Sequence, residues 1–190
     1  MMINNLFKYS QLVVATLFLG LFFSCTKEID FNQAKEFTLE PQVASSLVFF
    51  NAPATKFSVN NTEINTFKDS VIIDLFSRGF VVDHVVKSEF VFEIANSINR
   101  SFNVRIDFFD DNDIIRHSFA ITTSGSSANL DVITTHTEVF EGNTLNNLKA
   151  TQKVVLTAQA LAGGVPLNDS TPGNLILKSK GIFYFKIEAS

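Results

Sequence analysis

Apolar and polar residues alternate along several stretches of the chain, most clearly between residues 102 and 109. One set of alternate positions there is apolar, namely Phe102, Val104, Ile106 and Phe108. The positions between them are polar, namely Asn103, Arg105 and Asp107. Successive side chains of an extended chain point to opposite sides, so this order predicts a strand with one dry and one wet face. Residues 89–95 predict a second such strand, with Phe90, Phe92 and Ile94 sharing one face.

Clusters of turn-forming residues divide the rest of the chain into further short strands. These additional strands are expected at 36–42, 46–50, 71–76, 114–122, 130–140, 154–160 and 176–187. Turns and loops are expected at 51–55, at the tip Asn60-Asn61, and at 77–79, 124–127 and 163–173. A short helical turn is expected near 144–150, capped by Asn143 or Thr144, with Leu145 and Leu148 on one side.

Short links between consecutive strands predict which strands pair. The link 96–100 is rich in turn formers, so residues 89–95 and 102–109 are expected to pair as a hairpin. A second tight link, from Asp110 to Asp113, is expected to lead into the strand at 114–122. These three strands would then form an antiparallel meander.

About eight or nine strands with almost no helix predict an all-β fold, a single antiparallel β-sandwich of immunoglobulin-like or jelly-roll-like type. Phe and β-branched residues suit such a fold because they pack well on a pleated surface. The chain has 21 Phe among its 190 residues and a hydrophobic fraction of 46%, which is enough apolar surface for one core. The sandwich is expected to span residues 36–190.

The first 24 residues follow a different pattern. Lys8 is the only charged side chain before Cys25, and residues 12–23 are almost wholly apolar. This run is shorter than the roughly 20 residues that a membrane-spanning helix needs. A basic start, a short apolar stretch and a small residue before the boundary predict a signal peptide over residues 1–24. A buried N-terminal helix is the alternative.

The residues Leu21-Phe22-Phe23-Ser24-Cys25 resemble a lipobox, the motif at which a signal peptidase cuts before a cysteine that becomes lipidated. Relaxed lipoboxes with Ser before the Cys are similar to those of Bacteroidetes lipoproteins, although Phe22 and Phe23 are bulkier than the strict pattern. The resemblance implies that Cys25 carries acyl chains, such as palmitate, that anchor the protein in a membrane. A free reactive thiol is the alternative, but no Arg, His or second Cys lies nearby in the sequence to support it.

The residues from Cys25 onward bear on where the protein would be located. Residues 25–35 are polar without a clear period, so they are expected to form a tether. Thr26 differs from the Asp that, in some bacteria, holds lipoproteins at the inner membrane. Residues 27–30 are loosely similar to the Lys-plus-acidic signal of surface lipoproteins, and a plain soluble tether is the alternative. The expected location is the outer membrane of the cell envelope, with the periplasmic face and the cell surface both open.

Charge and cysteine content exclude several classes of partner and site. The net charge is −4, whereas nucleic-acid binding requires clustered Lys and Arg, so no nucleic-acid partner is expected. A single cysteine rules out an internal disulfide framework and a multi-cysteine metal site. His84, His117 and His136 lie on separate segments, without the spacing of a helical metal pair. The chain also lacks a G-x-S-x-G motif and a phosphate-binding glycine motif, so neither a cofactor nor enzyme activity is expected.

Two weaker candidates for binding remain. Asp110, Asp111 and Asp113 form the densest acidic cluster, and calcium uses oxygen ligands at alternate positions. The cluster lacks the glycine and the distal glutamate of a helical calcium loop, and Asp and Asn also stabilise tight turns without a metal. Tyr184 is the best aromatic candidate for stacking on a sugar, because the chain has no Trp and Tyr9 falls in the expected signal peptide.

Taken together, these patterns predict a non-enzymatic envelope lipoprotein that binds or scaffolds another envelope protein. The alternative is a glycan- or small-molecule-binding accessory of an outer-membrane uptake system. An enzyme would have only scattered Asp, Glu and His side chains for its chemistry.

Overall fold

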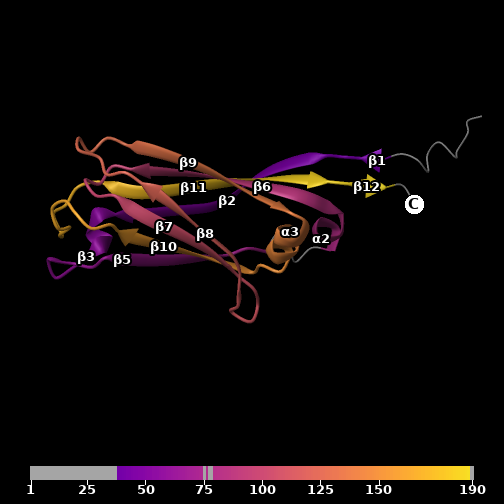
Figure 1. Ribbon diagram of the computed structural model, residues 1–190, viewed down its shortest axis with the longest axis horizontal. Helices are drawn as coiled ribbons and strands as arrows, with labels where there is room; N and C mark the ends of the chain where they lie inside the picture. Colours follow the sequence, from indigo (N-terminus) through magenta and orange to yellow (C-terminus); the bar gives the residue numbers. More distant parts are fainter. Residues whose placement is uncertain (1–37, 75, 77–78, 189–190) are drawn as a thin grey trace, which may run out of the picture. The chain divides into compact units, whose positions relative to one another are not determined.

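Eight antiparallel strands form two four-stranded sheets in the computed structural model, which describes residues 38–74, 76 and 79–188 (Figure 1). In sheet A the order is β2 (Gln42–Pro53), β11 (Asn174–Phe185), β6 (Val85–Asn96) and β9 (Val132–Glu141). In sheet B the order is β5 (Thr66–Ile72), β10 (Lys153–Ala160), β7 (Phe102–Phe109) and β8 (Ile115–Thr123). All of them belong to one compact unit, Thr38–Glu188. The expected signal peptide (1–24), Cys25 and the tether (25–35) lie outside the described residues.

Short elements accompany the two sheets. Four two-residue strands form two further pairs. Strand β1 (Thr38–Leu39) pairs with β12 (Ile187–Glu188), and β3 (Ser58–Val59) pairs with β4 (Thr62–Glu63). The 3-10 helix η2 (Ala54–Phe57) follows β2, and the helix α2 (Gly79–His84) precedes β6. The helix α3 (Gly142–Lys149) contacts β6, β8 and β9. It buries Leu145 and Leu148, which confirms the predicted helical turn and its apolar side.

The strand order is that of a jelly roll. Strand β7 pairs with β8, and the pairing then continues outward along the chain: β6 with β9, β5 with β10, and β2 with β11. The chain therefore forms one long antiparallel hairpin whose successive strand pairs alternate between the two sheets. Contacts of β11 with β6, and of β10 with β7, join these pairs into sheets A and B. Of the two sandwich types that the sequence left open, this rolled order corresponds to the jelly roll.

The hairpin expected between residues 89–95 and 102–109 is wrong. These residues lie in β6 of sheet A and β7 of sheet B, so the link between them crosses from one sheet to the other. Asn96 stabilises the crossing, because its Nδ2 donates to the carbonyl of Arg100 and its Oδ1 accepts the N–H of Ile98. Turn-forming residues mark where a strand ends but not which sheet the next strand joins. Of the expected meander, only the pairing of β7 with β8 is confirmed.

Several predicted boundaries also differ from the structure. The turn expected at 51–55 is wrong, because β2 continues to Pro53, which an edge strand tolerates on its unpaired side. The expected strand 71–76 is wrong as well, since β5 already ends at Ile72. The N-cap of α3 is Glu141, and the Thr144 hydroxyl accepts the Glu141 N–H as part of a capping box. The sequence does not predict α2, because six residues are too few to show a helical period.

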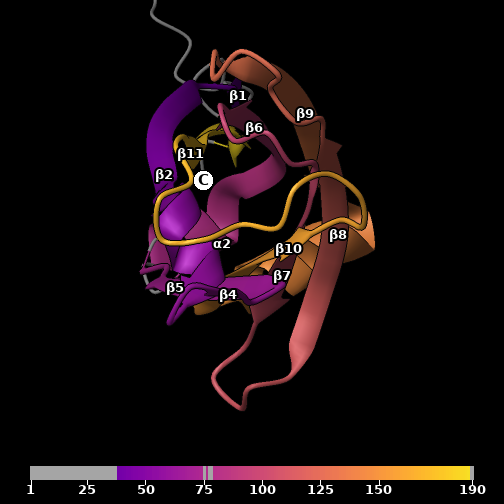
Figure 2. The same cartoon turned by 90° about the vertical axis from the view of Figure 1, so that its left-hand side faces the viewer.

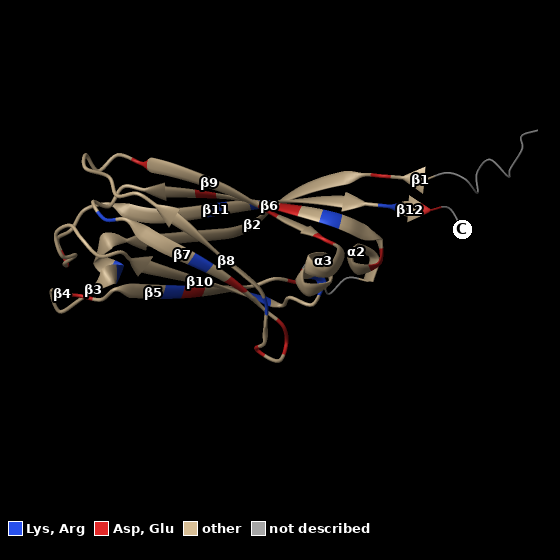
Figure 3. Cartoon of the chain, viewed as in Figure 1, with Lys and Arg blue, Asp and Glu red and all other residues tan. Residues whose placement is uncertain are grey.

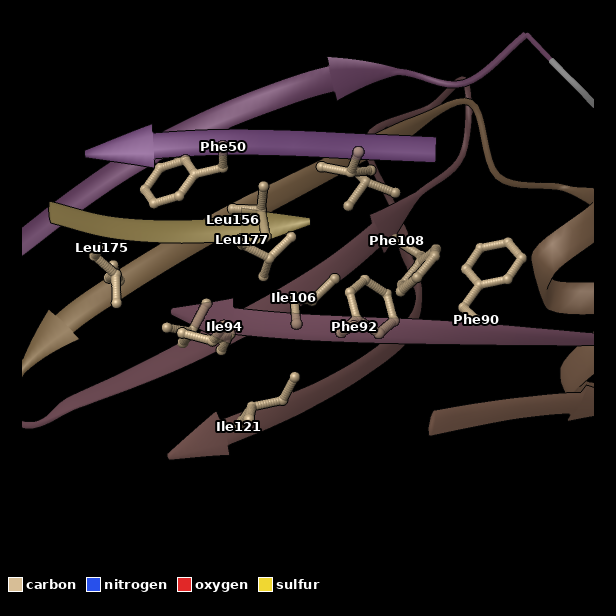
Figure 4. Close-up of a cluster of buried hydrophobic side chains, with 14 of the residues drawn as sticks. Phe50, Phe90, Phe92, Ile94, Ile106, Phe108, Ile121, Leu156, Leu175 and Leu177 are labelled. Atoms are coloured by element: carbon tan, nitrogen blue, oxygen red, sulfur yellow. The ribbon is translucent and has the colours of Figure 1, made fainter. Parts of the chain in front are cut away.

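Phenylalanine side chains from both sheets meet in the core (Figure 4). Phe90 of β6, Phe108 of β7 and Phe140 of β9 form a cluster with ring centroids 5.0, 5.5 and 6.2 Å apart. The seven apolar positions predicted for the two alternating strands are all confirmed as buried, each at most 1% exposed. Burial of these side chains removes a large apolar area from water, which is the main stabilising contribution to such a domain.

Replacing Phe92 or Phe108 with Ala is expected to lower the free energy of unfolding by about 3–5 kcal/mol, because the change leaves a cavity in the core. Denaturant or thermal unfolding of the purified variants measures this loss. Phe49→Ala is the matched control, because Phe49 is 66% exposed and its removal leaves the core intact. A Phe92→Ala or Phe108→Ala variant that unfolds like the wild type would contradict the core assignment.

Candidate binding surfaces

The outer face of sheet A carries several large apolar side chains. Strand registers place them on one face, because directly paired residues point to the same side, and polar partners such as Lys180, Glu89 and Glu93 alternate with them. The members of this apolar face are Phe49, Val91, Ile133, Val139, Ile176, Ile182 and Tyr184. Three of them are exposed, Phe49 by 66%, Ile133 by 53% and Val139 by 42%, and the rest are half-buried. An antiparallel sheet that faces only water normally has polar residues at such positions.

The outer face of sheet B is more polar. Its outward positions include Lys68, Ser70, Asn103, Arg105, Asp107, Ser118, Thr122, Thr157 and Gln159. Figure 3 shows charged positions along β5 and β7 of this sheet. Asp107 accepts hydrogen bonds from Arg105 Nε at 2.7 Å and from the Ser118 hydroxyl at 2.6 Å, so charges here are paired within the face. One end of this face is more apolar. The strand registers there place Ile72, Phe109 and Ile115 in one row across the sheet, with Lys153 between Ile72 and Phe109.

A β-bulge hollows the apolar face near its middle. Strand β2 places both Leu47 and Val48 opposite Ser179, whose hydroxyl accepts the Val48 N–H at 3.0 Å. The resulting depression, about 330 Å³, is lined by Ser46, Val91, Glu93, Thr135, Ser179 and the two lysines Lys178 and Lys180. Both lysines are exposed, and neither forms an ion pair with an acidic side chain among the residues that the structure describes.

Tyr184 lies on this apolar face, on the wetter side of β11 as the sequence predicts. The Lys87 ammonium sits 5.1 Å from the centroid of its ring, and Lys87 also pairs with Glu89 at 2.6 Å. Burial and a hydrogen bond with the Glu89 carboxylate raise the pKa of Tyr184. Because Lys87 already lies over the ring, stacking of a sugar on Tyr184 stays a prediction that these contacts do not favour.

The aspartate cluster forms the hairpin turn between β7 and β8. Asp110 Oδ1 accepts the N–H groups of Asn112 and Ile114, both at 2.9 Å, and its Oδ2 accepts from Arg116 Nε at 2.7 Å. Asp111 instead accepts from the Asn112 amide, and Asp113 pairs with Lys153. Among the described residues, no group of three or more His, Cys, Asp or Glu is placed to hold a metal ion. The three carboxylates thus have separate partners in a turn, and a calcium site there stays a prediction.

Asp110 makes the stability of the domain dependent on acid. The backbone N–H of Ile114, together with Arg116 and the N–H of Asn112, holds the pKa of this carboxyl below its ordinary value of 3.8. A lowered pKa in the folded state stabilises the domain above the unfolded value, and the stabilisation is lost as the pH falls through the folded value. We expect the melting temperature of the wild type to fall as the pH drops below about 4.

The variant Asp110→Asn should have a lower melting temperature at pH 7 and a flatter decline below pH 4, measured by thermal unfolding across a pH series. Asp111→Asn is the matched control on the same turn, because the Asp111 carboxylate is exposed and accepts only the Asn112 side-chain amide. If both variants kept the acid dependence of the wild type, Asp110 would not be its source.

Two of the three histidines meet where the edge strands β8 and β9 approach each other. Glu138 of β9 accepts from His117 Nε2 of β8 at 2.7 Å and from His136 Nε2 of β9 at 2.9 Å. His136 stacks on Phe119, with ring centroids 5.0 Å apart. His84 lies on α2 and stacks on Phe80 instead. The meeting of these residues cannot be predicted from the sequence. The spacing of His136 and Glu138 places both on one face of a strand, but nothing in the sequence indicates that the strand with His117 lies beside it.

The third surface is formed by loops at the end of the sandwich opposite β1 and β12 (Figures 1 and 2). Four connections meet here: the β3–β4 hairpin, the β6–β7 link (97–101), the β8–β9 loop (124–131) and the β10–β11 loop (161–173). We call them the loop platform. Figure 2 views this end and shows the β10–β11 loop, in yellow, crossing in front of it. The sequence predicts these loops individually but not that they adjoin.

Polar contacts join the four loops of the platform to one another. Glu63 of β4 pairs with the buried Arg100 of the β6–β7 link at 2.5 Å and also accepts the N–H of Leu167 at 2.9 Å. Asn96 donates to the carbonyl of Ser124 at 2.8 Å. Gly125 packs so closely on the link that an added Cβ would lie 2.7 Å from the Arg100 nitrogen. The loop platform is therefore held in one arrangement before any ligand binds.

The fold assignment rests on the strand order, and the comparisons with known proteins do not add to it. No protein-family model and no curated protein matches the chain. Among solved structures, a candidate secreted protein of Parabacteroides distasonis is 11% identical with a TM-score of 0.45, over 60% of this chain and 36% of that one. The structure of tomato aspermy virus is 11% identical with a TM-score of 0.41, over 93% and 96%.

A third solved structure, the VP2 subviral particle of infectious bursal disease virus, is 10% identical with a TM-score of 0.38, over 81% of this chain and 33% of that one. This chain therefore spans about a third of the length of the solved chains from Parabacteroides distasonis and infectious bursal disease virus.

Within the described residues, no helix has the length and apolar character needed to cross a membrane.

Proposed function

We propose that the chain is a non-enzymatic lipoprotein of a bacterial envelope that holds another envelope protein against the apolar face of sheet A. The observation that carries this proposal is the difference between the two outer faces. Sheet A exposes Phe49, Ile133 and Val139 along its face among lysines and glutamates, whereas the exposed apolar residues of sheet B, Ile72 and Ile115, lie in one row at its end. Exposed apolar area rimmed by polar residues is typical of protein-interaction sites.

The hollow in the apolar face indicates the chemistry of the partner. Lys178 and Lys180 line this hollow together with Glu93, which lies directly across from Lys178 in the register, and neither lysine forms an ion pair among the described residues. A partner that covers this face must pair these ammonium groups or bear the cost of burying them alone. We therefore expect an apolar partner surface that carries one or two carboxylates opposite these lysines.

Anchoring at Cys25 would leave the apolar face accessible. Residues 26–37 can span at most about 40 Å between the lipid and the domain. The domain begins at Thr38, in the β1–β12 pair at one end of the sandwich (Figure 1). The tether would therefore join the domain at one end and not on the outer face of either sheet, which leaves both faces accessible to a neighbouring envelope protein.

Cys25→Ala is expected to release the protein from the membrane fraction, because the acylated cysteine provides the anchor. Membrane fractionation, with mass spectrometry of the N-terminus, measures the change, and protease treatment of intact cells reports which side of the membrane is occupied. Thr26→Ala is the control and should remain anchored. An unprocessed N-terminus with an unmodified thiol in the wild type would contradict the proposal.

Phe49→Asp is expected to weaken partner binding about tenfold or more, because it introduces a charge in place of an exposed aromatic side chain on the apolar face. A photoreactive side chain placed at position 178 in cells gives the cross-linked partner whose yield is compared. Ile72→Asp is the matched control: Ile72 is 78% exposed, and it lies on an edge strand on the outer face of sheet B. Equal cross-linking by both variants, or equal loss, would refute the apolar face as the docking surface.

A further inference from the structure

The loop platform contains two adjoining hollows that have no part in the apolar face of sheet A. Their volumes are about 370 and 400 Å³, and Asn99 lines both of them. The first hollow also draws on Asn129, Asn168, Ser170 and Thr171, and the second on Ser101 and Ser124. Volumes of this size are typical of sites for small ligands.

The polar lining of these hollows consists mostly of side-chain amides and hydroxyls. A free amide both donates and accepts, as does a free hydroxyl. The Asn168 Oδ1 and the Ser101 hydroxyl already accept backbone N–H groups within the loops. Asn99, Asn129 and Ser124 are exposed, so their polar groups are accessible to a ligand. A lining of this kind complements a ligand whose own groups are hydroxyls rather than charges.

Arg100 forms the floor of the second hollow. Its side chain is 8% exposed, its Nη2 pairs with Glu63, and its Nε has no hydrogen-bond acceptor among the described residues. This Nε is itself buried from solvent, so it is an unsatisfied donor within the loops and not a contact for a ligand in the hollow. Gly164 lies against the guanidinium, because an added Cβ there would be in ordinary van der Waals contact with Nη1 at 3.5 Å.

The charge of the Arg100 floor is already balanced. Glu63 gives one oxygen to Arg100 and the other to the N–H of Leu167, so the pair is neutral as a whole. The remaining polar side chains that line the two hollows are uncharged. The site therefore offers directed donors and acceptors without a net field that would select an anion.

We propose that the two hollows form one groove that binds a neutral glycan, with Asn99 between two adjacent sugar units. The exposed side chains of Asn99, Ser124 and Asn129 hydrogen-bond the sugar hydroxyls. The loops are fixed in advance by the Glu63–Arg100 pair and by the Asn61 N–H bond to Asp169, so little ordering is needed on binding. This site is separate from the apolar face, and its function does not depend on a protein partner.

The test uses the whole processed protein, purified in detergent, titrated with tetrasaccharides of glucose, mannose, xylose and N-acetylglucosamine. Calorimetry and the amide NMR signals of residues 97–101 and 161–173 measure binding. We expect at least one tetrasaccharide to bind, and Asn99→Ala and Asn129→Ala each to weaken it about tenfold by removing hydrogen bonds. Asn143→Ala, an exposed asparagine on α3, is the matched control and should bind as the wild type does.

Three results would overturn the glycan site: no binding of any of the four tetrasaccharides at millimolar concentration, binding that Asn99→Ala leaves unchanged, or binding of inorganic phosphate or glucuronate in preference to every neutral sugar. Phe49→Asp separates this site from the proposed protein interface, because it should weaken partner cross-linking while leaving the affinity for the tetrasaccharide unchanged.

Discussion

The packing of phenylalanine rings between the two sheets is the interaction on which the other features of the domain depend. Phe90, Phe108 and Phe140 come from three strands of both sheets, and their contacts hold the sheets face to face. Once the inner faces are occupied in this way, the period of two along each strand determines which side chains remain outside. The apolar residues on the outer face of sheet A are therefore not surplus core residues, since the core is already filled without them.

Much of the fold can be predicted from the sequence, because alternation is a local signal. Residues 102–109 are predicted as a strand with the boundaries that β7 has, and the loop tip Asn60-Asn61 lies between β3 and β4 with positive φ at both residues. Strand pairing is not local, so the link after Asn96 predicts a hairpin although the chain there crosses from one sheet to the other. The same limitation hides the meeting of His117 with Glu138, because β8 and β9 become neighbours only in the rolled structure.

The candidate sites differ in how much of each can be predicted from the sequence. Tyr184 can be predicted to face outward from its place in β11, but the lysine over its ring comes from β6 and only the register shows it. The loop platform is harder to predict than the position of Tyr184, because the contacts among Glu63, Arg100 and Leu167 join residues that are widely separated in the chain. Buried polar groups of this kind are tolerated only when their partners are in place, so they define a single arrangement of the loops.

The pairing of β2 with β11 has a consequence for the way in which the protein is made. These strands come from opposite ends of the domain, and β12 even returns to the first described residues in β1. Sheet A cannot close until β11 has left the ribosome, because β11 fills the gap between β2 and β6. Non-local closure of this kind is slow, so the edges of β2 and β6 stay unpaired until late in folding. A product that stops before β11 would leave β2 and β6 as bare edges, open to aggregation and to proteases.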